Sequence, residues 1–205
     1  MNKYNSQVYH LIEQPTFTPL HLSNDQRSTI NHPITTPRLQ LRALSMTDAP
    51  AIFRLHTDVD VQRYLSRERM GSPLESREFI MKITEGVEQG RWLYWGIVLQ
   101  TAPEVLIGTV CLWQFTEHGQ RAELGYDLLP SYQQQGIMTE AVRGVLALAQ
   151  AHPRLAEIHA MVRSENLASV NLLKKLNFSY LRNLQEEEKF TKEQGMEIRI
   201  YCKTL

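Results

Sequence analysis

Cysteines and long apolar runs are scarce in this sequence. The 205 residues include 2 cysteines. Cys111 and Cys202 form no CxxC pair, and we interpret both as buried, reduced thiols. No apolar run approaches the roughly 18 residues of a transmembrane helix, and the N-terminus lacks the apolar core of a signal peptide. The sequence therefore predicts a cytoplasmic protein with no membrane contact.

Net charge and several signature motifs are missing as well. The 22 basic side chains balance 22 acidic ones, so the composition gives no reason to expect nucleic acid or an anionic membrane as a partner. The dinucleotide motif GxGxxG, the phosphate loop GxxxxGKS/T, the nucleophile elbow GxSxG and the zinc helix HExxH are all absent. The 7 histidines show no metal-ligand spacing, and we predict no metal site.

The length fits one domain preceded by an extension. At 205 residues the chain can bury a sizeable core as a single unit. Residues 1–33 are polar and aperiodic after one possible helix at 5–13, yet they keep several apolar side chains. We expect this extension either to be disordered or to dock on the domain or on a second subunit of a homodimer. We place the domain itself at 34–205.

Hydrophobic periodicity predicts a mixed α/β fold. Strand signals cover 36–42, 92–99, 105–115, 121–129, 157–163, 178–183 and 196–203. Helix signals begin near Asp48, run from a capping box at Ser72 to Gly90, and cover 136–150 and 166–176. Turns expected at Pro103 and at 117–120 make the middle strands an antiparallel meander. A strand–helix–strand–helix unit follows it.

A glutamine-rich turn precedes the helix at 136–150. Residues 133–138 have the sequence QQQGIM. The first backbone N–H groups of a helix have no intrahelical partner, and the helix dipole adds about half a positive charge there. Gly136 lacks the Cβ that would keep an anion away from this helix end. The turn therefore favours a phosphate site; the alternative is that Gly136 only permits a tight strand-to-helix turn.

Four segments, taken in order, resemble the GNAT superfamily of acetyl-CoA-dependent N-acetyltransferases. They are TPRLQLR at 36–42, ELGYDLLP at 123–130, QQQGIM at 133–138 and NLASVNLLKKLNF at 166–178. The closest likeness is to the Rim-like branch, which contains the ribosomal-protein N-terminal acetyltransferases. The resemblance spans 36–203. It implies a central mixed, mostly antiparallel twisted sheet of about six to seven strands flanked by helices, with a splayed strand pair that holds the cofactor.

The resemblance also implies an acetyl-CoA site. In this family the pyrophosphate binds to backbone amides of the turn, which correspond here to Gln133, Gln134, Gln135, Gly136, Ile137, Met138 and Thr139. Main-chain groups of the strand end would pair with the pantetheine arm as a strand would, and these are Asp127, Leu128 and Leu129. The alternative makes them ordinary strand-end residues. Asn166 would reach the pantetheine or cap its helix.

Two side chains are expected to move protons. Glu123 corresponds to the strand carboxylate that frequently acts as the base in this family; a solvated carboxylate or an ion pair is the alternative. The tyrosine that often protonates the leaving thiolate is replaced by Leu173. Ser169 lies one turn into the same helix and is the remaining donor candidate for the sulfur, unless it is an ordinary helix-surface serine.

The expected reaction is acetyl transfer from acetyl-CoA to a primary amine. An α-amine with a pKa near 8 is neutral in about a tenth of the molecules at pH 7, and a lysine in far fewer. The amine of a protein or peptide N-terminus therefore needs the weaker base. The first alternative is a small amine, such as a polyamine, amino acid or antibiotic. The replacement at Leu173 motivates the second, a regulatory module that binds acyl-CoA without turnover.

The acceptor side would be built from the early helices and loops at about 43–90, where acidic and basic residues balance. Trp113 and Phe115 are expected in the core, with walls of the acceptor pocket as the alternative.

Overall fold

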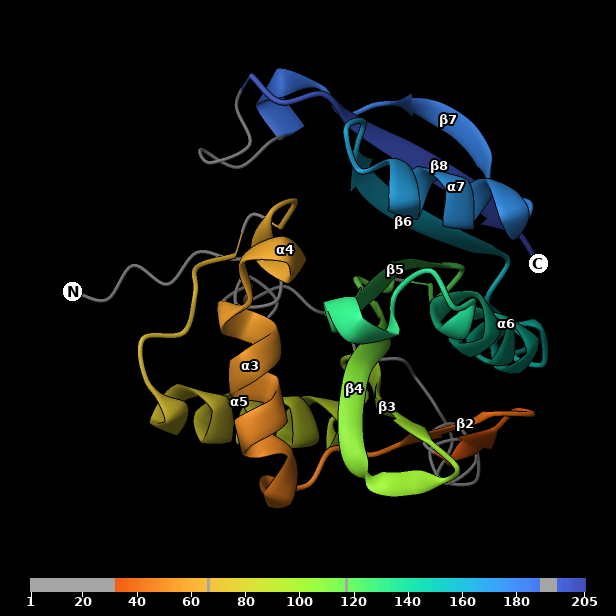
Figure 1. The fold of residues 1–205 in the computed structure, drawn as a ribbon. Helices are drawn as coiled ribbons and strands as arrows, with labels where there is room; N and C mark the ends of the chain where they lie inside the picture. The colour runs from red at the N-terminus through yellow and green to blue at the C-terminus, as the bar shows by residue number, and fades with distance from the viewer. Residues whose placement is uncertain (1–31, 66, 117, 189–194) are drawn as a thin grey trace.

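A single sheet organises the whole structure. The structure is a computed structural model that describes residues 32–65, 67–116, 118–188 and 195–205. The sheet has 8 strands in the order β1-β2-β3-β4-β5-β6-β8-β7 (Figure 1). It has one strand more than expected because Ile34–Thr35 forms an additional edge strand, β1. The helix expected at 5–13 and nearly all of the expected extension lie outside the described residues.

The first five strands pair antiparallel with one another in chain order, and the last three of them form the expected meander. The five strands are β1, β2 (Leu39–Arg42), β3 (Leu93–Leu99), β4 (Ala102–Trp113) and β5 (Arg121–Leu128). The turn expected at Pro103 is wrong, because the chain already turns at 100–101 and Pro103 lies within β4. The register shifts between Val98 and Leu99, so this part of β4 is irregular. Proline, which cannot donate a ladder hydrogen bond, is tolerated in such a bulge.

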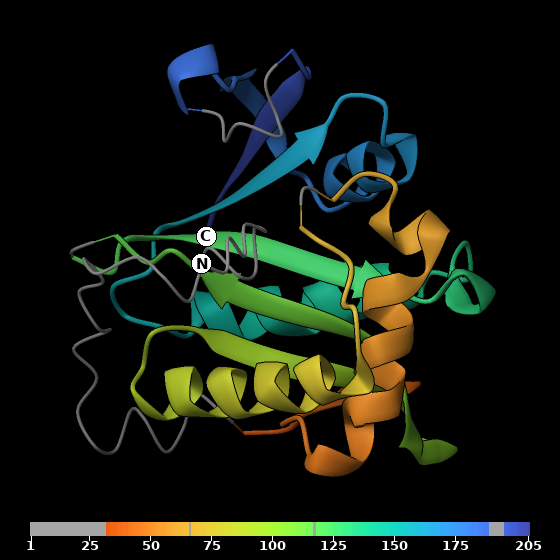
Figure 2. The same cartoon turned by 90° about the vertical axis from the view of Figure 1, so that its left-hand side faces the viewer.

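The second half of the sheet joins the first through one short parallel ladder. β5 pairs with β6 (Glu157–Arg163) from Arg121↔Glu157 to Glu123↔His159. Beyond these pairs the two strands diverge, as Figure 2 shows. β8 (Ile198–Thr204) continues the sheet antiparallel to β6, and β7 (Ser179–Asn183) pairs with β8. The splayed strand pair is therefore confirmed.

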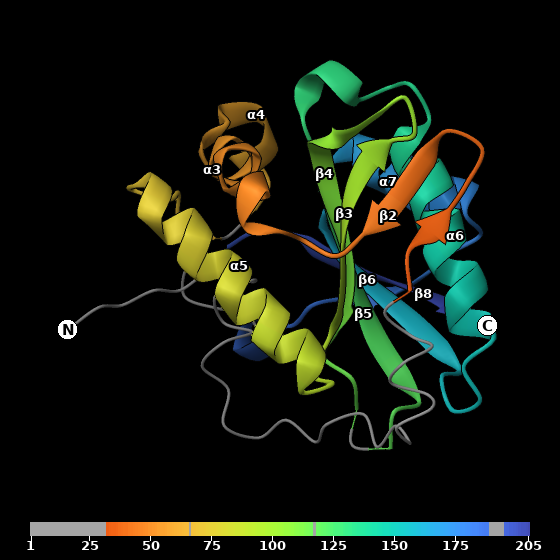
Figure 3. The ribbon, with the colours of Figure 1, turned by 90° about the horizontal axis from the view of Figure 1, so that it is seen from below.

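Helices cover both faces of the sheet (Figure 3). One face carries α3 (Ala49–Thr57), α4 (Val59–Gln62) and α5 (Pro73–Glu88). The other face carries α6 (Ile137–Gln150) and α7 (Leu167–Lys175). Short 3-10 turns complete the chain at Met46–Asp48, Pro130–Tyr132 and Glu186–Glu188. As predicted, α5 begins after Ser72 with a proline in its first turn, whereas α4 was not predicted.

The sheet separates two hydrophobic cores. Under α6 and α7 lie residues such as Leu41, Trp95, Val142 and Leu173. Under α3 and α5 lie residues such as Ile52, Phe79 and Trp92. Cys111 is buried in this second core, but the prediction for Cys202 is wrong because that thiol is partly exposed.

Candidate active site

A left-handed turn opens the N-terminus of α6. Gly136 is the N-cap residue and has φ 74°, a conformation that glycine adopts without steric cost. Gln134, with φ 58°, is also left-handed. Among the described residues no side chain caps α6, so its first backbone N–H groups are available to an anion.

The glutamine side chains brace this turn. Nε2 of Gln133 donates to the carbonyl oxygen of Leu128 at 2.9 Å, and Nε2 of Gln135 donates to that of Ser131 at 2.8 Å. Both amides therefore hold the loop in shape. The donors that fit a pyrophosphate are the backbone N–H groups, because the side chains of Ile137 and Met138 are buried in the core.

The segment that leads into β2 is fastened to α6 through Glu140. One carboxylate oxygen of Glu140 accepts from the Thr36 hydroxyl at 2.7 Å, and the other accepts from Nε of Arg38 at 2.6 Å. Arg38 Nη1 also donates to the carbonyl oxygen of Gln135 at 3.0 Å. Burial alone would raise the pKa of Glu140, but the hydrogen bonds from Thr36 and Arg38 lower it. This contact fixes the turn from outside, and no local sequence pattern signals it.

The end of β5 presents one unpaired edge toward the splay. On the other edge, Thr109 pairs with Asp127 and Gly108 with Leu128 in the β4–β5 ladder. The parallel ladder with β6 stops at Glu123. On this edge the carbonyl oxygen of Leu128 already accepts from the side chain of Gln133, so a pantetheine arm would pair with the remaining main-chain groups of the strand end. The N–H of Leu129 instead donates to the carbonyl oxygen of Ile107 at 2.9 Å, and the Leu129 side chain lies in the core under α3 and α5.

One face of β5 carries two buried carboxylates. Glu123, Gly125 and Asp127 alternate along the strand and point the same way. Glu123 is 6% exposed. A Cβ at Gly125 would lie 2.9 Å from Sγ of Cys111, so a larger residue between the two carboxylates would clash with this thiol.

The side chain of Asp127 belongs to a buried polar network that sequence reasoning missed. Its carboxylate accepts from Nη2 of Arg67 at 2.9 Å and from the Thr109 hydroxyl at 2.7 Å. The hydroxyl of Tyr94 donates to Thr109 at 3.0 Å, and Nε of Arg67 donates to Oε1 of Gln62 at 3.1 Å. The network ties α4 and the following loop to β5. Nothing local links residues so far apart in the sequence.

The opposite face of β5 brings a phenol to the second predicted catalytic residue. The side chain of Ser169 lies close enough to the hydroxyl of Tyr126 to affect its pKa. Burial raises the pKa of Tyr126 to about 12, and the nearby Ser169 side chain lowers it only in part. Asn166 caps α7 by accepting from the Ser169 N–H at 3.1 Å. Leu173, at the position of the family's tyrosine, is completely buried.

A cavity of about 510 Å³ connects these parts. Its lining includes most of the predicted site residues: Glu123, Asp127, Leu128, Gln133, Gln134, Gly136, Ile137, Met138, Thr139, Asn166 and Ser169. Leu129 and Gln135 are not part of the lining. Trp113 lines the cavity although it is also buried, whereas Phe115 belongs to the core under α6. The cavity thus runs from the start of α6, through the splay, to the face that carries Glu123.

Comparison with known proteins identifies the family. The model of the acetyltransferase (GNAT) domain matches residues 38–179. The chain belongs to the GNAT acetyltransferase family. This GNAT protein is also 32% identical over 143 residues to the uncharacterized N-acetyltransferase YoaA of Bacillus subtilis (strain 168). These residues make up 70% of this chain and 80% of YoaA. The family and these relatives support an acetyltransferase enzyme.

Solved structures show the same fold. RimL, a ribosomal alpha-N-protein acetyltransferase in complex with coenzyme A, superimposes with a TM-score of 0.75 and 18% identity, covering 85% of this chain and 98% of that one. Mycobacterium smegmatis RimJ, in complex with a coenzyme A disulfide, gives a TM-score of 0.71 with 21% identity over 81% of each chain. In the described part of this GNAT chain, every helix is too short or too polar to cross a membrane.

Proposed function

We propose that this GNAT enzyme uses acetyl-CoA to acetylate the N-terminal α-amine of a protein or peptide. The observation that carries the proposal is a continuous cavity that joins the start of α6, the β5–β6 splay and Glu123. The fold likeness to RimL and RimJ supports an α-amine acceptor, since RimL is named as an alpha-N-protein acetyltransferase of the ribosome.

Acetyl-CoA, the acetyl donor, fits two parts of the cavity. Backbone N–H groups of the Gly136 turn suit the pyrophosphate, because the helix end supplies unpaired donors and a favourable dipole. The end of β5 at Asp127 and Leu128, beyond the ladder with β6, suits the amides of the pantetheine arm, although Gln133 already occupies the carbonyl oxygen of Leu128. Asn166 caps α7 with its side-chain oxygen and keeps its amide nitrogen for the donor.

Proton movement would divide between the two faces of β5. The thioester supplies an activated acetyl group, and the amine nitrogen bonds to its carbonyl carbon as the carbon–sulfur bond breaks. Glu123 would take the proton that the amine loses, directly or through one water. Ser169, with the Tyr126 hydroxyl behind it, would donate a hydrogen bond or a proton to the departing sulfur.

The charges of the acceptor side fit a single amine better than a polyamine. The carboxylates in the cavity lining come from Asp60, Glu123 and Asp127. Arg63 pairs with Asp60 at 2.5 Å, and Arg67 pairs with Asp127 at 2.9 Å. Two of these carboxylates are thus already neutralised, so the pocket offers little uncompensated negative charge for a second ammonium group.

The test is release of free thiol from acetyl-CoA by the purified chain. The acceptor panel pairs short peptides that begin with serine or alanine with the same peptides blocked at the α-amine but carrying a free lysine, and adds spermidine and free amino acids. We expect release with the unblocked peptides only, and mass spectrometry should place the acetyl group on the α-amine. Release with spermidine or amino acids would favour the small-amine alternative. Coenzyme A binding without release from any acceptor would favour a regulatory module.

The role of Glu123 is tested by the pH dependence of the rate. In Glu123→Gln only the already neutral amine reacts, so the rate should fall most at low pH, where the amine is protonated. A pH–rate profile that keeps its shape would remove Glu123 from the mechanism. The homodimer, the domain boundary at residue 34 and the cytoplasmic location stay predictions.

A further inference from the structure

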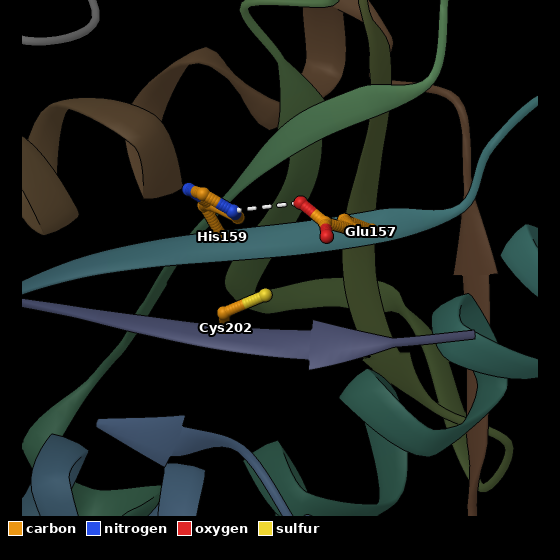
Figure 4. Close-up of side chains that lie close together, drawn as sticks. All are labelled: Glu157, His159 and Cys202. Atoms are coloured by element: carbon orange, nitrogen blue, oxygen red, sulfur yellow. Dashed lines mark hydrogen bonds and ion pairs between the residues drawn. The ribbon is translucent and has the colours of Figure 1, made fainter. Parts of the chain in front are cut away.

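Three side chains with metal-ligating atoms meet on one face of β6 and β8. Glu157 and His159 stand two residues apart on β6 and therefore point the same way. Cys202 lies directly opposite His159 in the antiparallel register of β8. Figure 4 shows the carboxylate, the imidazole and the thiol gathered beside the two strands. One ligand atom from each residue lies within 4.8 Å of the others.

We propose that Glu157, His159 and Cys202 bind a divalent transition-metal ion of the zinc class. They offer one oxygen, one nitrogen and one sulfur, all of which Zn²⁺ accepts. Mg²⁺ and Ca²⁺ prefer oxygen ligands alone, so the thiol and imidazole select against them. Bonds of about 2.0–2.3 Å in a tetrahedron place ligand atoms about 3.4 Å apart. Nε2 of His159 and Oε2 of Glu157 are already 3.2 Å apart, so only the Cys202 sulfur must come closer, through small side-chain rotations.

The ionisation of the three groups suits a dication. A metal would bind the neutral form of the His159 ring, which lies beside the charge of Arg121 on the neighbouring strand and near that of Arg182. Cys202 has a raised pKa because of burial and the Glu157 carboxylate. Metal binding would therefore release the thiol proton. A carboxylate and a thiolate together then balance the charge of the ion, and Arg182 is itself paired with Glu188 at 2.6 Å.

The position of the site gives access and an open coordination place. The side chain of His159 is 13% exposed and that of Glu157 is 46% exposed, so an ion can enter from solvent. Three protein ligands leave a fourth place for water or another small ligand. In the β5–β6 register His159 is the neighbour of Glu123, so the site adjoins the acceptor side of the cavity and is distinct from the donor site.

The proposal differs from the prediction of no metal site, and the reason is topological. Glu157 and His159 are separated by one residue, but the third ligand comes from a different strand near the end of the chain. No local spacing can show a ligand that the sheet register supplies.

The test is metal binding by the full-length chain after treatment with a chelator. Zn²⁺ is titrated in competition with a chromophoric chelator, and Co²⁺ is titrated while its absorption is recorded. We expect one equivalent to bind, with a thiolate-to-cobalt charge-transfer band. Cys202→Ser and His159→Ala should each weaken binding by more than about tenfold, because loss even of an outer-shell partner costs that much. Cys111→Ser is the matched control and should keep the affinity and the band.

A second measurement covers the case in which a ligand variant fails to fold. In Cys111→Ser protein, Cys202 is the only thiol of the chain, and Zn²⁺ should slow its alkylation by iodoacetamide at least tenfold. An alkylation rate that Zn²⁺ does not change would overturn the proposal. Absence of saturable binding at micromolar Zn²⁺, or binding that survives both Cys202→Ser and His159→Ala, would overturn it as well.

Discussion

Removing the carboxylate of Asp127 should destabilise the protein strongly. The side chains of Arg67 and Asp127 are 3% and 6% exposed, and their ion pair measures 2.9 Å. In Asp127→Ala the guanidinium of Arg67 stays buried and keeps only its hydrogen bond to Oε1 of Gln62 among these contacts, and Thr109 loses its acceptor. Breaking a buried pair from one side costs about 3–5 kcal/mol. That is a large share of the roughly 5–15 kcal/mol by which a domain is stable.

The measurement is urea unfolding followed by circular dichroism, with a surface pair as the control. Asp60 pairs with Arg63, but those side chains are 53% and 60% exposed, so Asp60→Ala should cost less than about 1 kcal/mol. The double variant Arg67→Met with Asp127→Ala should be more stable than Asp127→Ala alone, because it leaves no buried charge unpaired. A cost for Asp127→Ala as small as that for Asp60→Ala would refute the reasoning, as would a double variant that loses the sum of both single costs.

Three further changes test other parts of the structure. In Gly136→Ala a residue with a Cβ must adopt the backbone angle φ 74°, which costs about 1–2 kcal/mol. Isothermal titration should therefore show an affinity for coenzyme A that is reduced about tenfold. Unchanged affinity would contradict this turn geometry. Tyr126→Phe should lower the single-turnover rate about tenfold and leave the KM for acetyl-CoA unchanged. Adding Ser169→Ala should lower the rate little further if the two residues act as a unit. A single-turnover rate equal to that of the wild type would show that Tyr126 has no part in the reaction. Burial and Arg67 lower the pKa of His56 well below 6.5, so the unfolded chain binds more protons at this residue and the protein loses stability as the pH falls through 6.5. Between pH 7.5 and 5.5 the wild type should lose about 1.4 kcal/mol more unfolding free energy than His56→Leu. Equal losses in urea unfolding would refute a neutral buried imidazole.

Features that are written into a few neighbouring residues were predictable from sequence. The start of α5 was visible because Ser72 and the following proline have a local preference for a helix N-terminus. The bounds of β6 were visible because its apolar residues alternate along the whole strand. The position of Pro103 was predicted wrongly, because a bulge in the β3–β4 register lets β4 begin before the proline.

Contacts between distant segments could not be predicted in this way. The pairing of Arg67 with Asp127 depends on where the loop after α4 crosses β5. The meeting of Tyr126 with Ser169 depends on how far β5 and β6 diverge. The resemblance to the family placed Glu123 and the Gly136 turn on one cavity, but it gave no signal for these supporting partners, which depend on the packing of this particular chain.

If acetyl-CoA binds in the splay between β5 and β6, the stability of the folded state would also depend on the supply of this donor. An interrupted ladder leaves a strand edge inside the protein's own sheet, and a bare edge can recruit other polypeptides. If the donor supplies the missing strand, its free concentration sets part of the folding free energy through RT ln(1 + [L]/Kd). The resistance of the enzyme to unfolding and to edge-to-edge aggregation would then rise and fall with the cellular pool of coenzyme A.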